Sequence, residues 1–302
     1  MERLLLITPA RDEADHLERT VRAVQAQTRP PDLWLIVDDG STDETPALLD
    51  RLAAETPFLE VRRSPERTAE PGEDGLAVAA EAVAFNEALA GVDLCGFTHV
   101  GKLDADVELP PTYLEDLLAR FAAEPSLGIA GGTLLEREDG EWRAAKVPPT
   151  HVRGALKLYS RSCFEAIGGI QERLGWDTID ETYARMKGFE TRSLPQPEAR
   201  HHRPVATRSG TLRGRARHGQ CAYILRYGFW WVGLRSLKVA RLRPRGLSGL
   251  AFLYGYLRAA ARRESRVEDE SYRRFVAQEL RDRVRAAGDS APVKVPTFFM
   301  RS

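Results

Sequence analysis

Short apolar runs alternate with helical periodicity along the first two thirds of the chain. Runs typical of buried strands lie at 4–8, 33–37, 59–62, 97–103, 127–135, 142–144 and 191–194. Between and after them, apolar residues recur every three or four positions, which predicts helices at 17–24, 48–52, 77–89, 114–121 and 176–187. This alternation predicts an α/β fold with a mostly parallel sheet, helices on both faces and ligands at the carboxyl ends of the strands.

Two carboxylates end the apolar run at 97–103. Asp104 and Asp106 are one residue apart and precede Pro110-Pro111. On an extended backbone, side chains at i and i+2 project to the same side. Such a pair suits a hard divalent cation, which prefers oxygen ligands and often shares them with phosphates. Asp-X-Asp pairs are also common in turns, so the pair alone leaves a structural role open.

Composition limits the class of protein. The chain has 302 residues, of which 43% are hydrophobic, so it can bury the core of one large domain or of a domain with an appendage. Cys95, Cys163 and Cys221 are far apart and form no Cys-X-X-Cys pair, which disfavours a disulfide framework and a zinc site. These cysteines fit a reducing cytoplasm. No secretory signal is expected, because only a short apolar run follows Met1.

The formal net charge of +0 hides a strong asymmetry. Residues 203–263 contain fourteen Arg or Lys and no Asp or Glu, so the rest of the chain carries a net charge of −14. Aromatic residues interrupt this basic segment, a combination that suits a membrane surface, nucleic acid or a phosphorylated lipid. Its longest apolar run, 246–257, is shorter than the ~20 residues that span a bilayer. A segment of this kind that meets a membrane lies on it.

Five short motifs occur along the chain, and both their sequences and their order are informative. They are Pro9-Ala10-Arg11-Asp12-Glu13, Val37-Asp38-Asp39-Gly40-Ser41-Thr42-Asp43, Leu103-Asp104-Ala105-Asp106, Gly168-Gly169 and Trp176-Asp177. Together they resemble the family 2 glycosyltransferases of the GT-A fold, over about residues 3–204. The resemblance implies a nucleotide-sugar donor, Mg²⁺ or Mn²⁺, and inversion at the anomeric carbon. It also implies a Rossmann-like GT-A domain over 1–205, with a nucleotide-binding half at about 1–110 and an acceptor half at about 111–205. A helical, basic extension is expected over 206–302.

The resemblance implies roles for single residues. The donor pocket would be lined by Pro9, Arg11, Glu13, Asp39, Asn86 and Lys102, with Asp39 bonding the base. Asp104 would face the ribose and the metal, and Asp106 would hold the metal between the two phosphates. A histidine after the last strand is a ligand in similar enzymes, which makes His201 and His202 candidates. A structural hydrogen bond is the alternative for each.

Asp177 is the candidate general base, which would take the proton from the acceptor hydroxyl. Gly169 belongs to a small, flexible segment before it, and Trp176 is expected to offer a flat apolar face for an acceptor sugar. A helix N-cap is the alternative role for Asp177. The family often has Glu-Asp where this chain has Trp176-Asp177, which leaves the base open between Asp177 and Asp180. It also often has Asn in place of Asp12.

The function expected from these features is that of a glycosyltransferase of class EC 2.4, in cell-surface polysaccharide or glycolipid synthesis. The donor would be a UDP-, GDP- or dTDP-sugar and the acceptor a sugar or a lipid-linked sugar. The location would be cytoplasmic, with peripheral contact to anionic membrane at its inner face, and no nucleic-acid partner is expected.

Two other functions compete with this one. A nucleotidyltransferase acting on a sugar phosphate would need a Gly-rich phosphate loop after the first strand, where the chain has Pro9-Ala10-Arg11-Asp12-Glu13. A dinucleotide oxidoreductase is disfavoured by the same segment. A non-enzymatic module that binds membrane or polyanions would explain the basic segment, but not Asp104, Asp106 or Asp177.

Overall fold

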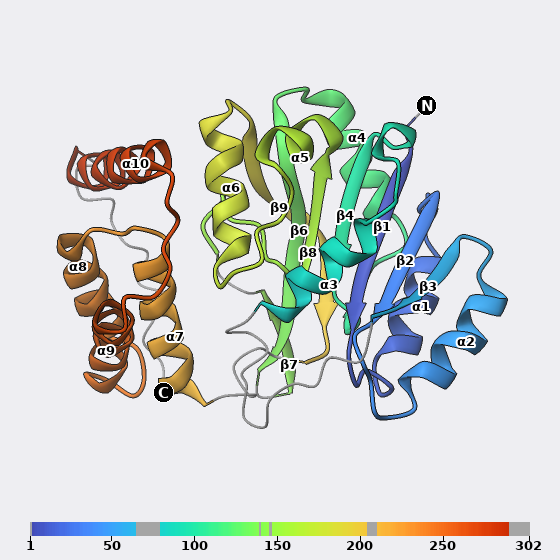
Figure 1. The fold of residues 1–302 in the computed structure, drawn as a ribbon, viewed down its shortest axis with the longest axis horizontal. Coiled ribbons are helices and arrows are strands. Elements are labelled where there is room, and N and C mark those ends of the chain that lie inside the picture. The colour runs from blue at the N-terminus through green and yellow to red at the C-terminus, as the bar shows by residue number, and fades with distance from the viewer. Residues whose placement is uncertain (1, 65–78, 139, 145–146, 204–209, 290–302) are drawn as a thin grey trace. The chain divides into compact units, whose positions relative to one another are not determined.

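The chain divides into two compact units in the computed structural model, Met1–Arg208 and Ser209–Ser302 (Figure 1). The structure describes residues 2–64, 79–138, 140–144, 147–203 and 210–289. The first unit combines a sheet with helices, and the second is helical. An α/β domain followed by a helical C-terminal region was predicted and is confirmed. Residues 206–209 and 290–302 of the predicted extension lie outside the described residues.

One sheet runs through the first unit. Its strands are β1 (Leu4–Ala10), β2 (Leu33–Asp38), β3 (Leu59–Arg63), β4 (His99–Leu103), β5 (Val107–Glu108), β6 (Leu127–Glu138), β7 (Glu141–Ala144), β8 (Leu156–Ser160) and β9 (Glu190–His201). Their order is β3-β2-β1-β4-β8-β6-β9-β5, and β7 pairs with β6. The strands β3, β2, β1 and β4 are parallel, so their carboxyl ends share one edge. The pairs that involve β8, β7 and β5 are antiparallel, whereas β6 and β9 are parallel.

Helices cover both faces of this sheet (Figure 1). They are α1 (Leu17–Gln25), α2 (Thr45–Glu55), α3 (Ala80–Leu89), α4 (Tyr113–Ala123), α5 (Arg161–Ile167) and α6 (Trp176–Met186), and a 3-10 turn spans Leu94–Gly96. Successive strand residues point to opposite faces. Leu4 and Leu6 accordingly join the core under α1, α2 and α4, while Leu5 and Ile7 join the core under α3, α5 and α6.

The last strand is longer than the sequence predicted. The sequence predicted a short strand at 191–194, and Pro195 and Pro197, residues that regular sheet pairing disfavours, follow it. Instead β9 continues to His201. A register shift lies between the pairs Gly131/Ser193 and Thr133/Glu198, so the prolines fall where the regular ladder is interrupted. The resumed pairing carries His201 to the same edge of the sheet as the end of β4.

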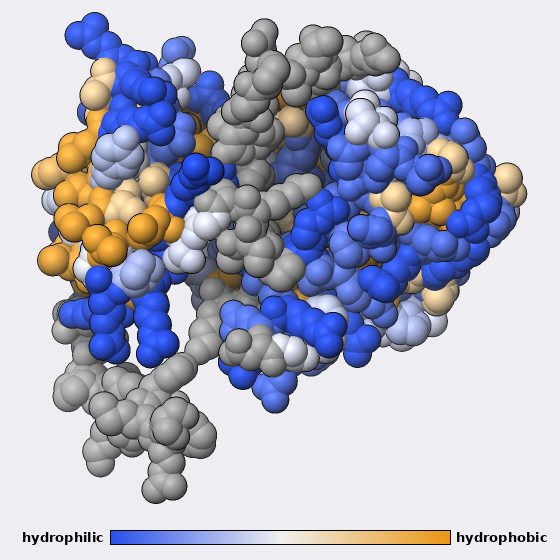
Figure 2. Space-filling view, turned by 90° about the horizontal axis from the view of Figure 1, so that it is seen from below, coloured by the Kyte–Doolittle hydropathy of each residue, from blue (hydrophilic) through white to orange (hydrophobic). Residues whose placement is uncertain are grey.

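The second unit contains α7 (Thr211–Ile224), α8 (Phe229–Val239), α9 (Leu247–Ala261) and α10 (Glu270–Asp289). Helix α9 packs against both α7 and α8. It approaches α7 closely through glycine, since a Cβ atom on Gly255 would lie 1.8 Å from the carbonyl oxygen of Ala216. Apolar surface gathers on this unit in Figure 2. Among the described residues, no helix combines the length and apolar character needed to cross a membrane.

Candidate active site

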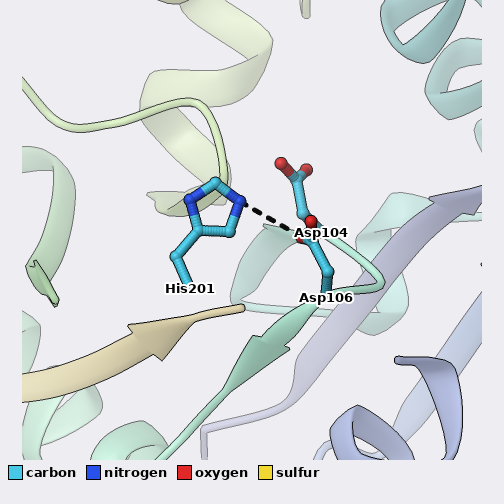
Figure 3. Close-up of side chains that lie close together, drawn as sticks. All are labelled: Asp104, Asp106 and His201. Atoms are coloured by element: carbon cyan, nitrogen blue, oxygen red, sulfur yellow. Dashed lines mark ion pairs between the residues drawn. The ribbon is translucent and has the colours of Figure 1, made fainter. Parts of the chain in front are cut away.

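An acidic pair and a histidine meet at the carboxyl end of β4. Asp104 directly follows β4, and Asp106 directly precedes β5. Strand β5 pairs antiparallel with β9, with Val107 opposite His201, and this pairing brings the end of β9 beside the acidic pair. One ligand atom from each of Asp104, Asp106 and His201 lies within 4.8 Å of the other two (Figure 3). The structure therefore brings together three of the four residues that the sequence offered as metal ligands.

The donor set fits a divalent cation. Two ligands on opposite sides of an ion, with bonds of about 2.2 Å, are about 4.4 Å apart, which is close to the observed limit of 4.8 Å. Carboxylates suit Mg²⁺ and Mn²⁺, and an imidazole nitrogen suits transition metals. Asp106 and His201 are buried, whereas the Asp104 side chain is 27% exposed. The cluster is therefore open to solvent on the Asp104 side.

Positive charge surrounds the buried Asp106. Its Oδ1 lies 3.3 Å from His201 Nε2, and its Oδ2 lies 3.8 Å from Arg203 Nε. Burial by itself lowers the pKa of His201, but hydrogen bonds with Asp106 and Glu136 and the charges of Asp106 and Asp104 outweigh burial and raise this pKa to about 9. A metal ion bound by His201 would therefore displace a proton from the ring. Burial raises the pKa of Asp106, but His201 and Arg203 together hold it below its ordinary value. Asp106 is thus an ionised carboxylate at neutral pH.

The loops after β1 and β2 are bonded to each other. The Asp12 backbone N–H donates to Ser41 Oγ at 3.0 Å, and Asp12 Oδ1 accepts from the Thr42 N–H at 2.8 Å. The Glu13 N–H donates to Thr45 Oγ1 at 2.8 Å. Asp12 has φ 53°, a left-handed conformation that Asn and Asp tolerate better than other side chains. Asp12 is therefore a residue type that suits this left-handed position, as Asn would be.

The predicted nucleoside-pocket residues lie on these two loops and the strands before them. Pro9 is a half-buried residue of β1, Arg11 follows β1, and Asp39 follows β2 as a buried residue whose N–H donates to Ala10 O at 2.9 Å. The carboxylate of Glu13 forms an ion pair with Arg203, which also lies beside Asp106. Arg203 therefore links the loop after β1 to the metal-ligand cluster.

Lys102, a residue of β4, contacts the Asp104 carboxylate. Its side chain is buried, and Nζ donates to Asp104, to Glu81 Oε2 at 3.3 Å and to the Gly154 carbonyl at 3.0 Å. Burial by itself lowers the pKa of Lys102, but Asp104 and Glu81 outweigh it and raise the pKa above its ordinary value. The Lys102 charge therefore holds the Asp104 carboxylate in place.

Asp177 is the second residue of α6, and Gly175 is the N-cap. The N-cap alternative for Asp177 is therefore wrong, although an acid in the first turn is still favoured by the helix dipole. Asp177 is half-buried and packs beside Gly154, where an added Cβ would lie 3.4 Å from the Asp177 Cβ. The next residue, Ala155, accepts a hydrogen bond from the Asp104 N–H at 2.8 Å. The segment 154–155 thus contacts both Asp104 and Asp177.

Trp176 does not offer the face that the sequence predicted. Its side chain is buried, with 5% exposure, and its Nε1 donates to Glu81 Oε1 at 3.1 Å. The ring packs against Gly154, where an added Cβ would lie 3.0 Å from it. The prediction of an exposed ring for an acceptor sugar is therefore corrected, because Trp176 belongs to the core under α6.

Asp180 lies in a buried ion-pair network instead of facing a pocket. Lys157 Nζ donates to both Asp180 oxygens at 2.9 Å, and Tyr159 OH donates to Oδ2 at 2.5 Å. Burial raises the pKa of Asp180 to about 6, although Lys157 lowers it in part. Lys157 also donates to the Asp177 carbonyl at 2.5 Å and lies 3.2 Å from Glu181 Oε1. This arrangement speaks for Asp180 as a support of the first turns of α6, and against it as the base.

The remaining sequence candidates have structural partners. Asn86 Nδ2 donates to the Ile170 carbonyl at 2.8 Å and to Glu172 at 3.0 Å, so it ties α3 to the loop before α6. Gly169 has φ 78° next to Gly168 at φ 76°, which explains the Gly-Gly pair as a turn after α5. His202 Nε2 lies 2.8 Å from Glu108 Oε2, outside the cluster of three ligands.

Sequence reasoning missed four residues that support this site: Glu81, Lys157, Glu181 and Arg203. Glu81 bonds Lys102 and Trp176 from α3, and no local pattern sets it apart. Glu181 accepts from the Val152 N–H at 2.6 Å and lies beside His151. Lys157 did carry a signal, since it is a single charge within the apolar run of β8.

Comparison with known proteins finds similar glycosyltransferases. The sequence model of the family described as Glycosyl transferase family 2 matches residues 5–74. Beta-monoglucosyldiacylglycerol synthase of Synechocystis sp. is 29% identical over 199 residues, which cover 59% of this chain and 39% of that protein. Glycosyltransferase AglD of Haloferax volcanii is 28% identical over 213 residues, covering 63% of this chain and 32% of that protein. The chain thus spans less than half the length of these two relatives.

A solved structure shares the fold. The mannosyltransferase PcManGT from Pyrobaculum calidifontis, in complex with GDP-Man and Mn²⁺, superposes with a TM-score of 0.55 at 19% identity. The match covers 94% of this chain and 80% of that one. The fold predicted from the sequence, GT-A with a C-terminal helical region, is therefore confirmed. Residues 5–74 are thus similar to family 2 glycosyltransferases, the family that the sequence motifs resemble.

Proposed function

We propose that the protein transfers a sugar from a nucleotide-diphosphate sugar to an acceptor hydroxyl, with inversion at the anomeric carbon and with the help of Mg²⁺ or Mn²⁺. The observation that carries this proposal is the cluster of Asp104, Asp106 and His201, with ligand atoms within 4.8 Å of one another. It lies at the edge where the parallel strands end, which is where α/β sheets bind ligands.

The donor is proposed to lie between the two bonded loops and the cluster. The loops after β1 and β2 belong to the segment 5–74 that matches the family, and they carry Arg11, Glu13 and Asp39. We infer that these residues hold the nucleoside. Arg203 contacts both Glu13 and Asp106, so it can bind a diphosphate that lies between the loop after β1 and the cluster. The complex of PcManGT with GDP-Man and Mn²⁺ supports a nucleotide sugar as the donor class.

A divalent cation held by Asp104, Asp106 and His201 would offset the negative charge that builds on the diphosphate as the sugar leaves. Basic residues of the chain already place positive charge at this site. Lys102 and Arg203 bring positive charge to Asp104 and Asp106, and burial strengthens each interaction. Loss of Asp104 would leave Lys102 with Glu81 as its carboxylate partner, and loss of Asp106 would leave Arg203 with Glu13. Either loss would also remove a candidate metal ligand.

Asp177 is proposed to be the base that takes the proton from the acceptor hydroxyl. It stands at the first turn of α6, and the segment 154–155 lies in contact with both it and Asp104. The buried Lys157 holds this turn in place through the Asp177 carbonyl and the Asp180 carboxylate. A base opposite the leaving group favours direct displacement, and direct displacement inverts the anomeric carbon.

The acceptor is proposed to be a sugar or a lipid-linked sugar, in the synthesis of a glycolipid or a cell-surface polysaccharide. The similarity to Beta-monoglucosyldiacylglycerol synthase supports a glycolipid product. The basic segment 203–263 supports action at the inner face of a membrane. The domain limits proposed for this function are 1–205 for transfer and 206–302 for the extension.

A thermal-shift screen of UDP-, GDP- and dTDP-sugars, with and without Mn²⁺, tests the proposal. A ligand that binds only the native state raises its apparent stability, by about 2.7 kcal/mol at a hundred times the dissociation constant. We expect one nucleotide class to raise the melting temperature only with the metal present. Asp106→Ala should lose that shift and keep its fold. A metal-dependent shift of equal size in Asp106→Ala, or no shift with any donor, would contradict the proposal.

A further inference from the structure

Helices α8 and α9 carry large apolar side chains that are exposed and do not belong to the core of their unit. On α9, Leu247, Leu250, Tyr254 and Leu257 follow one another at spacings of three, four and three residues and are 47–63% exposed. Such spacing places side chains on one face of a helix. On α8, the exposed large apolar side chains are Phe229, Trp230, Leu234 and Leu237, with Leu237 at 68%. We name these eight residues the apolar stripe.

The opposite side of α9 explains why the stripe stays exposed. Phe252, Tyr256 and Ala259 are buried on that side. Glycine lets α9 approach both neighbours, since an added Cβ on Gly249 would lie 2.6 Å from the Ser236 carbonyl on α8, and one on Gly255 would lie 1.8 Å from the Ala216 carbonyl on α7. The helix therefore makes its packing contacts on one side and turns its large apolar residues outward. Figure 2 shows apolar surface gathered on this unit.

Positive charge flanks the apolar stripe. The exposed basic residues of this part of the chain are Arg235, Lys238, Arg241, Arg243, Arg245, Arg258, Arg262 and Arg263. Residues 209–263 contain no Asp or Glu. A second copy of the chain docking on the same face would bring like charges together. An anionic surface would satisfy the charge and the apolar side chains at once.

We propose that the apolar stripe docks this unit on an anionic phospholipid bilayer, with α8 and α9 lying in the plane of the interface. Helix α9 has 15 residues, fewer than the ~20 needed to cross the hydrocarbon core. Amphipathic helices with large apolar residues on one side and Arg or Lys beside them lie in the plane of the membrane interface, with the apolar side at the boundary between headgroups and acyl chains. Trp230 and Tyr254 have an apolar body and a polar tip, which suits the boundary between acyl chains and headgroups.

This proposal gives a specific surface to the membrane contact proposed above, and it rests on that contact but not on sugar transfer. The two fail separately, because vesicle binding is measured without any nucleotide sugar. A chain that binds vesicles and no donor would refute the transfer reaction alone. A chain that binds a donor and no vesicles would refute the docking surface alone.

Flotation of the full chain with phosphatidylglycerol/phosphatidylcholine vesicles at low salt tests the surface. We expect the protein to float with anionic vesicles and to stay behind with pure phosphatidylcholine vesicles. The double substitution Leu237→Ser/Leu250→Ser should lower the partition coefficient at least tenfold. The matched control is Val284→Ser, which removes an exposed apolar residue of α10 and should leave flotation unchanged. Melting curves of both variants show whether the fold is kept.

The charged part of the surface has its own variant and control. Arg241→Gln/Arg243→Gln should weaken binding to anionic vesicles at least tenfold, whereas Arg274→Gln/Arg281→Gln on α10 should not. Failure of the unmodified chain to float would overturn the proposal. So would equal flotation of all variants, or equal binding to neutral vesicles. A chain that dimerises in solution, becomes monomeric with Leu237→Ser/Leu250→Ser and ignores vesicles would assign the stripe to a second copy instead.

Discussion

Asp177→Asn separates a catalytic role from a structural one. Asp177 is the second residue of α6 and is half-buried, and among the described residues no hydrogen bond to its carboxylate is present. Replacement by Asn therefore removes the favourable interaction with the helix dipole, worth about 0.3–1 kcal/mol, and the attraction of the Asp177 charge to Lys157 and His151, both of which keep the Glu181 carboxylate as a partner. In a unit of this size that lowers the melting temperature by about 1–4 °C. Loss of a general base lowers the rate by roughly 10²–10⁴-fold.

Asp180→Asn should behave in the opposite way. The substitution removes the charge that faces Lys157 in a buried pair with both distances at 2.9 Å. Breaking such a pair costs about 3–5 kcal/mol, because the remaining charge stays buried. Glu181, at 3.2 Å from Lys157, keeps part of the compensation, so we expect the lower end of that range. The melting temperature should then fall by roughly 6–12 °C.

The assay is release of nucleoside diphosphate from saturating donor, with water or an added sugar as the attacking hydroxyl, beside a melting curve for each variant. Asp177→Asn should lose at least a hundredfold in rate and almost no stability. Asp180→Asn should lose stability and, below its melting temperature, keep more of its rate than Asp177→Asn. If Asp177→Asn turns over donor normally and Asp180→Asn does not, the base has been assigned to the wrong carboxylate.

Three further predictions follow from single contacts. His201→Asn should weaken Mn²⁺ binding in a calorimetric titration while His202→Asn leaves it unchanged; the reverse order would move the ligand to His202. Asp12→Ala should cost about 1–2 kcal/mol in denaturant unfolding, because its left-handed φ of 53° suits Asn and Asp, and Asp12→Asn should be nearly neutral. Burial lowers the pKa of His151, but Glu181 outweighs it and raises the pKa. The stability that this pair contributes is therefore complete below pH 6.5 and is lost as the pH rises through the raised pKa, and His151→Asn should remove that part of the pH dependence. A pH dependence of unfolding in His151→Asn that equals that of the unmodified chain would contradict this.

Local pattern was enough to place Asp104 and Asp106. Both follow an apolar strand, and the ends of parallel strands meet at one edge of a sheet, so a candidate site could be located from the sequence. The choice between His201 and His202 could not be made in the same way. Neighbouring residues of a strand point to opposite sides, and which side faces the acidic pair depends on the pairing of β5 with β9. That register is set by residues far apart in the sequence.

The other differences between prediction and structure come from contacts with residues that are distant in the sequence. Trp176 is next to the proposed base in sequence, but Glu81 and Gly154 enclose its ring, and neither lies near it along the chain. Asp180 likewise meets Lys157 of β8 only in the folded unit. The basic character of residues 203–263 was plain from the sequence. Which apolar residues of α9 face outward was not, because close packing at Gly255 determines the side that is buried.

Turnover of the donor found by the thermal-shift screen, with Mn²⁺ and with EDTA, tests the central claim most directly when the unmodified chain and Asp106→Asn are compared. Asp106→Asn keeps the shape of the side chain and removes its charge at the cluster of Asp104, Asp106 and His201. We predict that the unmodified chain releases nucleoside diphosphate only with the metal, and that Asp106→Asn loses at least a hundredfold of that rate, as expected when charge stabilisation in the transition state is removed. Equal turnover in EDTA, or full metal-dependent turnover by Asp106→Asn, would contradict a metal-assisted sugar transfer at this site.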